Sequence, residues 1–141
     1  LLYRSGAGLT PRPLRRIASG GELSRVMLAS KVVLGNADGV DTLVFDEVDA
    51  GVGGSTARAL AGVLADLAAT HQVIVVTHLA QVAVMADKHY VVSKEPGDVP
   101  QTHLDEVTGE ARTAEIARML SGDQSEASLA HAKQMLAEAR A

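Results

Sequence analysis

The sequence contains no cysteine among its 141 residues, which excludes disulfide bonds and thiolate metal ligands. The five histidines, at positions 71, 78, 89, 103 and 131, show no spacing typical of a metal site. Aromatic residues are scarce, with only Tyr3, Phe45 and Tyr90 present. No apolar run approaches the roughly 20 residues that a membrane helix needs, and no charged and then apolar leader opens the chain. We therefore expect a cytoplasmic protein without a membrane partner.

The hydrophobic content of 47% is ample for the core of one domain of this length. The chain begins with Leu1 and not with methionine, from which we expect a segment of a larger protein. The net charge of -4 hides a basic start, since four arginines precede the first acid, Glu22: Arg4, Arg12, Arg15 and Arg16. This start is compatible with a phosphate-bearing partner, although a solvated face is the commoner meaning of so few charges.

Periodicity and turn residues predict the first elements of the chain. Residues 1–18 form a connector, because Pro11 and Pro13 cannot lie inside a helix. An amphipathic helix begins at Glu22 and ends at Gly35, and its apolar positions recur at intervals of three and four: Leu23, Val26, Met27, Ser30 and Leu34. The apolar runs 42–45 and 73–77 predict strands that are covered on both faces. A helix between them carries Leu60, Val63, Leu64 and Leu67.

This strand, helix and strand form a βαβ unit, whose two strands must run parallel. The rest of the chain predicts a short helix over 79–86, a hairpin of 89–94 with 102–107 around Pro96-Gly97-Asp98, and two closing helices. The first of these helices carries Ile116, Met119 and Leu120 and stops at Gly122, and the second covers 125–140. The fold class is therefore α/β, with a parallel βαβ core followed by a β-hairpin and two helices.

A serine, two glycines and a glutamate stand directly before the first helix: Ser19, Gly20, Gly21 and Glu22. A serine and a glutamate three residues apart have the pattern of an ordinary capping box. The two glycines favour a second interpretation, because bare amides at a helix amino terminus bind anions such as phosphate. Both interpretations stay open from the residues alone, since short glycine-rich motifs recur by chance.

Two adjacent carboxylates, Asp46 and Glu47, follow the first strand. Acids near a helix start are often there because of the helix dipole, but these precede a glycine-rich loop that separates them from the next helix. In the functional interpretation, Asp46 binds a Mg²⁺ ion through water, and Glu47 deprotonates an attacking water. Phosphoryl transfer needs both tasks.

One histidine, His78, follows the second strand. Most single loop histidines have no catalytic task. Parallel strands, however, end at the same edge of a sheet, and open α/β sheets bind ligands there. The topology therefore predicts that His78 lies beside Asp46 and Glu47, where it would contact a γ-phosphate or the attacking water.

Three segments together resemble the ABC-type ATPases in order and spacing: IASGGELSR, TLVFDEVDAGVGG and VIVVTHLAQVAVMAD. They match the signature motif, the Walker B strand with its D-loop, and the switch histidine of that family. The glutamate of the signature motif and the DEVD junction resemble the SMC-like branch, which works on DNA. The resemblance covers nearly the whole chain, including RTAEIARMLSG. It implies the carboxyl-terminal lobe of an ABC/SMC-type P-loop NTPase head over residues 19–141.

The resemblance implies a role for each matching residue. The signature motif, residues 18–22, is matched by Ser19, Gly20, Gly21 and Glu22, and its serine and glycine amides would touch the γ-phosphate of ATP on the opposite head. On ATP held by the same head, Asp46 would hold Mg²⁺, Glu47 would be the catalytic base and His78 would sense the γ-phosphate. The D-loop would face a second head and consists of Asp49, Ala50, Gly51, Val52, Gly53 and Gly54. SMC-type loops commonly carry a further aspartate at the position of Gly53, and what replaces that carboxylate is an open question.

No G-x-x-x-x-G-K-[ST] loop occurs in the chain, so the usual cradle for the β- and γ-phosphates is missing. In the family that loop and the Q-loop lie in an amino-terminal lobe, beyond a long coiled coil. The implied partners are therefore that lobe, a second head in a homodimer, and DNA. The implied function is ATP-dependent head dimerisation and ATP hydrolysis in DNA double-strand break repair and recombination, in the cytoplasm and on the nucleoid. The chain alone would be inactive.

Two alternatives belong to other classes of protein. The chain would also fit the nucleotide-binding domain of an ABC transporter, which a coiled-coil pattern upstream of Leu1 would reject. It would also fit a non-catalytic lobe that lends its signature surface to a partner. Intact Asp46, Glu47 and His78 argue against this last interpretation, because such a lobe leaves them without a task.

Overall fold

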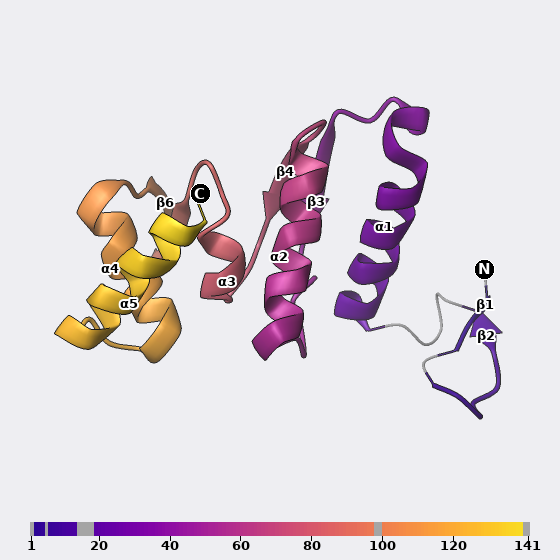
Figure 1. The fold of residues 1–141 in the computed structure, drawn as a ribbon, viewed down its shortest axis with the longest axis horizontal. Coiled ribbons are helices and arrows are strands. Elements are labelled where there is room, and N and C mark those ends of the chain that lie inside the picture. Colours follow the sequence, from indigo (N-terminus) through magenta and orange to yellow (C-terminus); the bar gives the residue numbers. More distant parts are fainter. Residues whose placement is uncertain (1, 5, 14–18, 98–99, 140–141) are drawn as a thin grey trace. The chain divides into compact units, whose positions relative to one another are not determined.

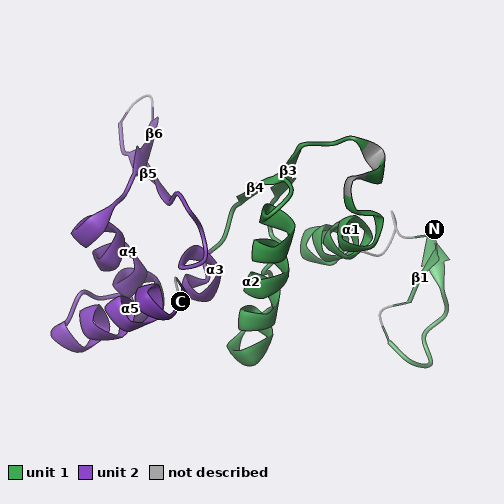
Figure 2. Cartoon of the chain, turned by 45° about the horizontal axis from the view of Figure 1, so that its top comes forward, with its two compact units in different colours: residues 1–77 green, residues 78–141 purple. Residues whose placement is uncertain are grey.

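The computed structural model describes residues 2–4, 6–13, 19–97 and 100–139. The chain consists of two compact units, residues 1–77 and residues 78–141 (Figure 2). We describe each unit by itself.

The first unit begins with a short antiparallel pair of strands. Leu2–Tyr3 (β1) pairs with Arg12–Pro13 (β2), so that Leu2 lies opposite Pro13 and Tyr3 opposite Arg12. Both strands lie within the connector predicted over residues 1–18. The later part of the predicted connector, with Arg15 and Arg16, lies outside the described residues.

The first helix, α1, spans Gly20–Leu34 and starts two residues before the predicted position. Ser19 caps it in a full capping box: the Ser19 hydroxyl accepts from the Glu22 amide at 3.2 Å, and the Ser19 amide donates to Glu22 Oε2 at 3.0 Å. The helix ends at Gly35, as predicted, and the 3₁₀ turn η2 (Gly35–Asp38) follows.

The apolar stripe predicted on α1 is largely exposed in the described part of the chain. Its members Leu23, Met27 and Leu34 are exposed, while Leu28 and Gly21 are the buried positions of the helix. Residues 21 and 28 are seven apart and lie on one face of a helix. The reason is that α1 turns this other face toward the loop after the next strand, as described below.

The predicted βαβ unit is present. Strand β3 (Thr42–Phe45) runs parallel to β4 (Gln72–Val75), and helix α2 (Gly54–Ala68) connects them (Figure 1). Thr42 pairs with Gln72 and Phe45 with Val75, and the Val76 amide extends the ladder by donating to the Phe45 carbonyl at 2.9 Å. The buried residues of α2 recur at helical spacing and form one stripe: Ala57, Leu60, Ala61, Leu64 and Leu67.

Only one face of the β3–β4 pair is covered within the described residues, contrary to the expectation of strands buried on both faces. Leu43 and Phe45 are buried, but Val44, between them, is 64% exposed. Ile74 and Val76 on the neighbouring strand are 47% and 58% exposed. Helix α2 covers one side, and nothing described in this unit covers the other. In the described part of the chain, the two strands therefore have one buried and one exposed face.

The second unit is built from helices and one hairpin. Helix α3 (Ala80–Ala83) is shorter than the 79–86 predicted. The hairpin pairs β5 (Tyr90–Glu95) with β6 (Gln101–Glu106), Tyr90 lying opposite Glu106, one residue from the predicted limits. The two closing helices are α4 (Gly109–Ser121) and α5 (Glu126–Glu138), and Gly122 ends α4 with a φ of 77° as the sequence predicted. Asp98 of the predicted turn lies outside the described residues.

The core of the second unit joins three helices. Its buried members are small or aliphatic and come from α3, α4 and α5: Ala80, Ala83, Val84, Ile116, Ala117 and Ala132. Met119, Leu120 and four residues of the last helix region pack against this cluster. Among the described helices, none is both long enough and apolar enough to cross a membrane.

Candidate nucleotide-binding site

The acidic turn, which we define as residues 46–50, follows β3 and carries both predicted carboxylates. Asp46 and Glu47 are exposed, whereas Val48 and Asp49 are buried. Glu47 has a φ of 56° and is the only non-glycine residue with a positive φ in the described part of the chain. Side chains rarely adopt this conformation, and its cost of about 1–2 kcal/mol must be offset by surrounding contacts. The turn is therefore held in place by its neighbours.

The amino terminus of α1 lies against this turn. A Cβ atom on Gly20 would overlap Glu47 Oε2, and one on Gly21 would lie 2.7 Å from the Glu47 carbonyl oxygen and 2.8 Å from Ala50 Cβ. Gly21 is thus required for the close approach of helix and turn, because it meets a backbone oxygen and a Cβ atom, whereas Gly20 meets only the end of the Glu47 side chain, which can shift. The structure therefore brings together two groups of predicted residues, Ser19 to Glu22 and Asp46 with Glu47, within one chain.

Two polar side chains of α1 bind the backbone of the acidic turn. Ser24 Oγ donates to the Asp46 carbonyl at 2.6 Å. Arg25 Nη1 donates to the carbonyls of Val48, at 3.1 Å, and Ala50, at 2.9 Å. Sequence reasoning missed both residues. Their spacing gave a signal, because positions 21, 24, 25 and 28 form one helical stripe.

The fourth residue of the DEVD junction, Asp49, has a different environment from the rest of the predicted D-loop. It is 2% exposed, and its Oδ2 accepts a hydrogen bond from Thr77 Oγ1 at 2.5 Å. This bond joins the acidic turn to the segment just after β4. A buried carboxylate held in this way acts as an internal tie.

The other D-loop residues form a largely exposed loop: Ala50, Gly51, Val52, Gly53 and Gly54. Gly51 and Gly54 have positive φ values of 72° and 56°, which only glycine adopts readily. Gly53 has a φ of -162°, and a Cβ there would meet nothing within 4 Å. Backbone geometry thus explains the first two glycines but gives no reason for the third.

The predicted switch histidine, His78, is exposed and opens the second unit. It follows Thr77 directly in the sequence, and Thr77 is bound to the acidic turn through Asp49. The expected proximity of His78 to Asp46 and Glu47 stays a prediction, since the two units are described separately.

The described residues contain no group of three or more His, Cys, Asp or Glu side chains able to hold a metal ion. An exposed single carboxylate such as Asp46 nevertheless fits Mg²⁺, because this ion keeps most of its waters and is otherwise bound by substrate phosphates. The donor set thus fits an ion that arrives with a nucleotide, and does not fit a resident metal centre.

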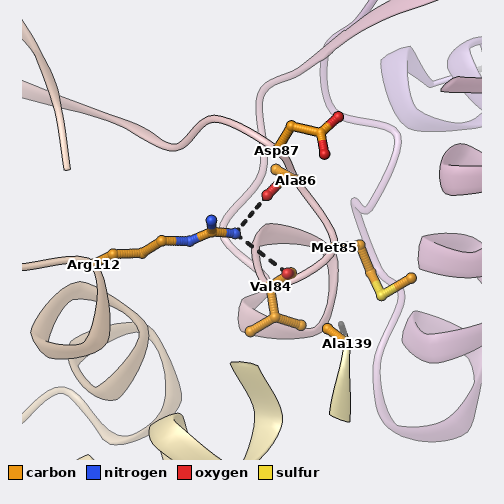
Figure 3. A pocket seen from close by; sticks show the side chains of 6 residues that line it. All are labelled: Val84, Met85, Ala86, Asp87, Arg112 and Ala139. Atoms are coloured by element: carbon orange, nitrogen blue, oxygen red, sulfur yellow. Dashed lines mark hydrogen bonds between the residues drawn. The ribbon is translucent and has the colours of Figure 1, made fainter. Parts of the chain in front are cut away.

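A buried arginine lines a cavity of about 330 Å³ in the second unit (Figure 3). Arg112, on α4, is 7% exposed, and its Nη2 donates to the carbonyls of Ala83, Val84 and Ala86 at 3.2, 3.3 and 2.6 Å. These carbonyls end helix α3, so the guanidinium caps that helix. The sequence held a signal, since Arg112 lies four residues before Ile116 on the core face of α4. The guanidinium is committed to structure and offers no ligand site.

Burial and charge pairing shift the pKa values of two groups near Arg112, His89 and Glu115. Burial lowers the pKa of His89, Arg112 lowers it further, and Glu115 opposes both effects. The pKa of Glu115 is itself lowered, first by its hydrogen bond from Arg118, whose Nη2 donates to Glu115 Oε1 at 2.6 Å.

Comparison with known proteins gives a consistent result. No protein-family model matches the chain. The chain is 53% identical over 137 residues to the DNA repair protein RecN of Treponema pallidum (strain Nichols), a match that covers 96% of this chain and 24% of that protein. RecN of Deinococcus radiodurans is 54% identical over 138 residues, covering 97% of this chain and 24% of that protein. RecN of Streptomyces coelicolor is 49% identical over 143 residues, covering 100% and 25%.

The fold has a solved counterpart. It is similar to a structure from work on ATP-driven dimerisation and DNA-stimulated activation of SMC ATPases, with a TM-score of 0.57 and 21% identity over 82% of this chain and 69% of that chain. The chain therefore has the α/β fold of an SMC-type ATPase head. Its sequence narrows the comparison: over nearly its whole length the chain is similar to RecN proteins, and it spans about a quarter of the length of those curated relatives.

Proposed function

We propose that this chain is the carboxyl-terminal lobe of an ATP-binding and ATP-hydrolysing SMC-like head that acts in DNA double-strand break repair and recombination. The observation that carries the proposal is the convergence of the α1 amino terminus and the acidic turn at the end of β3. A helix amino terminus that favours phosphate and a carboxylate pair suited to metal and water are the parts that phosphoryl transfer needs.

Each predicted residue has a task in this proposal. In the signature motif Ser19 to Glu22, the serine and the amides of Gly20 and Gly21 contact the γ-phosphate of ATP that is held by the opposite head. Asp46 binds Mg²⁺ through water, and the ion, when bound, neutralises charge on the phosphates. Glu47 accepts the proton of the attacking water. His78 contacts the γ-phosphate on its own head.

Two features suggest the partners: a missing phosphate-binding loop and an exposed apolar sheet face. A phosphate-binding loop is absent from the sequence, and the uncovered face of β3–β4 presents Val44, Ile74 and Val76. We infer that an amino-terminal lobe supplies the loop and covers this face, as parallel sheets require cover on both sides. A second head completes the site in a homodimer. A role in DNA repair is inferred from the names of the relatives. Residence in the cytoplasm, on the nucleoid, follows from that proposed role.

The alternatives receive less support. The RecN relatives, at about half identity, favour an SMC-like protein over a transporter domain. The strained backbone at Glu47 favours a catalytic lobe over one that only lends a surface, because such strain is found chiefly at functional sites.

The test uses the full-length protein. We expect Glu47→Gln to bind ATP normally, to lose turnover and to accumulate as an ATP-bound dimer, because the amide cannot accept the proton. Nucleotide binding, phosphate release and light scattering measure these three properties. Turnover near the wild-type rate would reject Glu47 as the base.

A second variant tests the assignment of the signature motif. We expect Ser19→Arg to bind ATP as a single head and to remain monomeric, since a bulky cation then occupies the face that meets the other head. Normal ATP-dependent dimerisation of this variant would contradict the proposal that Ser19 acts on the opposite head's nucleotide.

A further inference from the structure

The backbone of the acidic turn is bound more completely than its exposed position suggests. All five carbonyls from residue 46 to residue 50 accept hydrogen bonds. Two of these bonds are local, from the Ala50 amide to Glu47 at 3.0 Å and from the Val52 amide to Asp49 at 2.9 Å. The other three carbonyls, at 46, 48 and 50, are bound by Ser24 and Arg25 of α1. Most of the turn's outside support therefore comes from one turn of one helix.

This support surrounds the strained residue. Glu47 has a φ of 56°, and the carbonyls of the residues on either side of it, Asp46 and Val48, accept hydrogen bonds from side chains of α1. A conformation that is costly by itself persists only where the neighbours fix it. Ser24 and Arg25 are therefore placed to hold the backbone on both sides of Glu47.

The same helix carries the signature motif at its amino terminus. Gly20 and Gly21 lie less than two helical turns before Arg25, and both pack directly against the acidic turn. The helix is continuous over 15 residues, and a capping box fixes its start. A displacement of its amino terminus thus reaches the acidic turn without an intervening flexible segment.

We propose that Ser24 and Arg25 are positioning residues through which α1 links the two ATP sites of a dimer. One end of the helix contacts the nucleotide held by the opposite head, and its next turn sets the backbone of Glu47 in its own head's site. This inference rests on the proposed function. It also answers the question raised by Gly53, because α1 provides a route between the sites that needs no carboxylate in the D-loop.

The kinetic test compares Arg25→Met with Arg58→Met in the full-length protein. Arg58 is an exposed arginine of α2 that makes none of the α1 contacts with the acidic turn, and its replacement controls for loss of a surface charge. We expect Arg25→Met to lower kcat by roughly tenfold or more while KM for ATP changes by less than about twofold, because misplacement of a catalytic group affects mainly the transition state. Arg25→Lys should recover part of the rate, since an ammonium group keeps donors but lacks the guanidinium fork.

Mixed dimers decide which site Arg25 serves. One head carries Glu47→Gln, so that a single active Glu47 remains, and Arg25→Met is placed in either head. We expect the rate to fall when Arg25→Met is in the head with the active Glu47, and to stay unchanged when it is in the other head. A fall only in the second arrangement, or an equal fall in both, would overturn the proposal.

Hydrogen exchange tests the link itself, independently of turnover. The amides of Ala50 and Val52 close the acidic turn and report on its order. We expect a non-hydrolysable ATP analogue to slow their exchange in the wild-type dimer, and to have no such effect in an Arg25→Met dimer. Equal slowing in both proteins would overturn the link.

The two proposals fail in different ways. If Glu47→Gln hydrolyses ATP like the wild type, the proposed function fails, and the link fails with it. If Glu47→Gln is inactive and Arg25→Met matches Arg58→Met in kcat, the proposed function stands and the link alone is wrong. Thermal unfolding of Arg25→Met and Ser24→Ala shows whether a variant has lost activity because it no longer folds. If Arg25→Met does not fold, the kinetic comparison is made with Ser24→Ala and Arg25→Lys.

Discussion

At the scale of single residues, Asp46, Glu47 and Asp49 show how one short acidic segment divides its tasks. Asp46 and Glu47 are exposed, and Glu47 is held in a strained conformation, whereas Asp49 is buried and bound to Thr77. The identity of these residues was visible in the sequence. Their division was not, because whether a carboxylate faces solvent or the interior depends on the turn geometry and on a residue 28 positions away.

A carboxylate in the second unit has the largest described shift in pKa. Asp123 Oδ1 accepts from Ser128 Oγ at 2.7 Å, from Ser121 Oγ at 3.0 Å, and from both the hydroxyl and the amide of Ser125. These bonds, chiefly the one from Ser128, lower the pKa of Asp123 from 3.8 to about 2. The ionised carboxylate therefore ties the end of α4 to the start of α5.

This shift predicts a pH dependence. Because the pKa is lower in the folded state, the contribution of Asp123 to stability is fully present above about pH 4 and is lost as the pH falls toward 2. We expect Asp123→Asn to have a lower Tm than the wild type at pH 7, and the difference to shrink between pH 4 and pH 2. Thermal unfolding followed by circular dichroism across this range measures it. A difference that stays constant with pH would contradict the assignment.

At the scale of elements, α1 shows where periodicity predicts a helix but not its environment. The sequence predicted the helix and its stop at Gly35, and both are confirmed. The predicted apolar positions Leu23 and Met27 are exposed, and the stripe with Ser24 and Arg25 faces the acidic turn. Hydrophobic spacing predicts that a helix forms, but it does not say which neighbour each side of the helix contacts.

The start of α2 offers a test of why Gly53 is not an aspartate. Gly53 is the N-cap residue of α2, it has an extended φ of -162°, and no side chain caps the helix. We expect Gly53→Asp to stabilise the protein by a few tenths of a kcal/mol, because its carboxylate can accept from the first-turn amides. Chemical denaturation measures the change.

The neighbouring glycine provides the matched control. Gly54 has a φ of 56°, so Gly54→Asp should destabilise the protein by about 1 kcal/mol. If Gly53→Asp were equally destabilising, folding would account for the glycine. The expected result would instead favour a cause in the proposed contact of this loop with a second head or its nucleotide.

At the scale of the whole molecule, the bare face of the β3–β4 pair and the missing phosphate loop point to the same partner. Val44, Ile74 and Val76 are apolar and about half exposed or more. Burying a valine contributes about 1.5–3 kcal/mol, and burying an unpaired charge in its place is unfavourable.

This predicts how the separated lobes behave. The 141-residue chain alone should show no measurable ATPase activity, and adding the amino-terminal lobe should restore it. We expect Val44→Glu to weaken association of the lobes by at least about tenfold, whereas Val92→Glu, on the exposed side of the hairpin, should leave it unchanged. Titration calorimetry measures the affinity. Magnesium-dependent hydrolysis by the chain alone would contradict the proposal.

The sequence by itself determined the order of elements, the parallel βαβ unit and the position of the candidate site residues. These features depend on local propensity, on hydrophobic period and on the geometry of parallel crossovers, all of which are encoded within short stretches. Only the tertiary structure decided that Gly20 and Gly21 press against Glu47, that Asp49 is bound to Thr77 and that Arg25 holds the acidic turn. Those contacts join residues more than 20 positions apart, and no local pattern specifies which distant carbonyl a guanidinium or hydroxyl will bind.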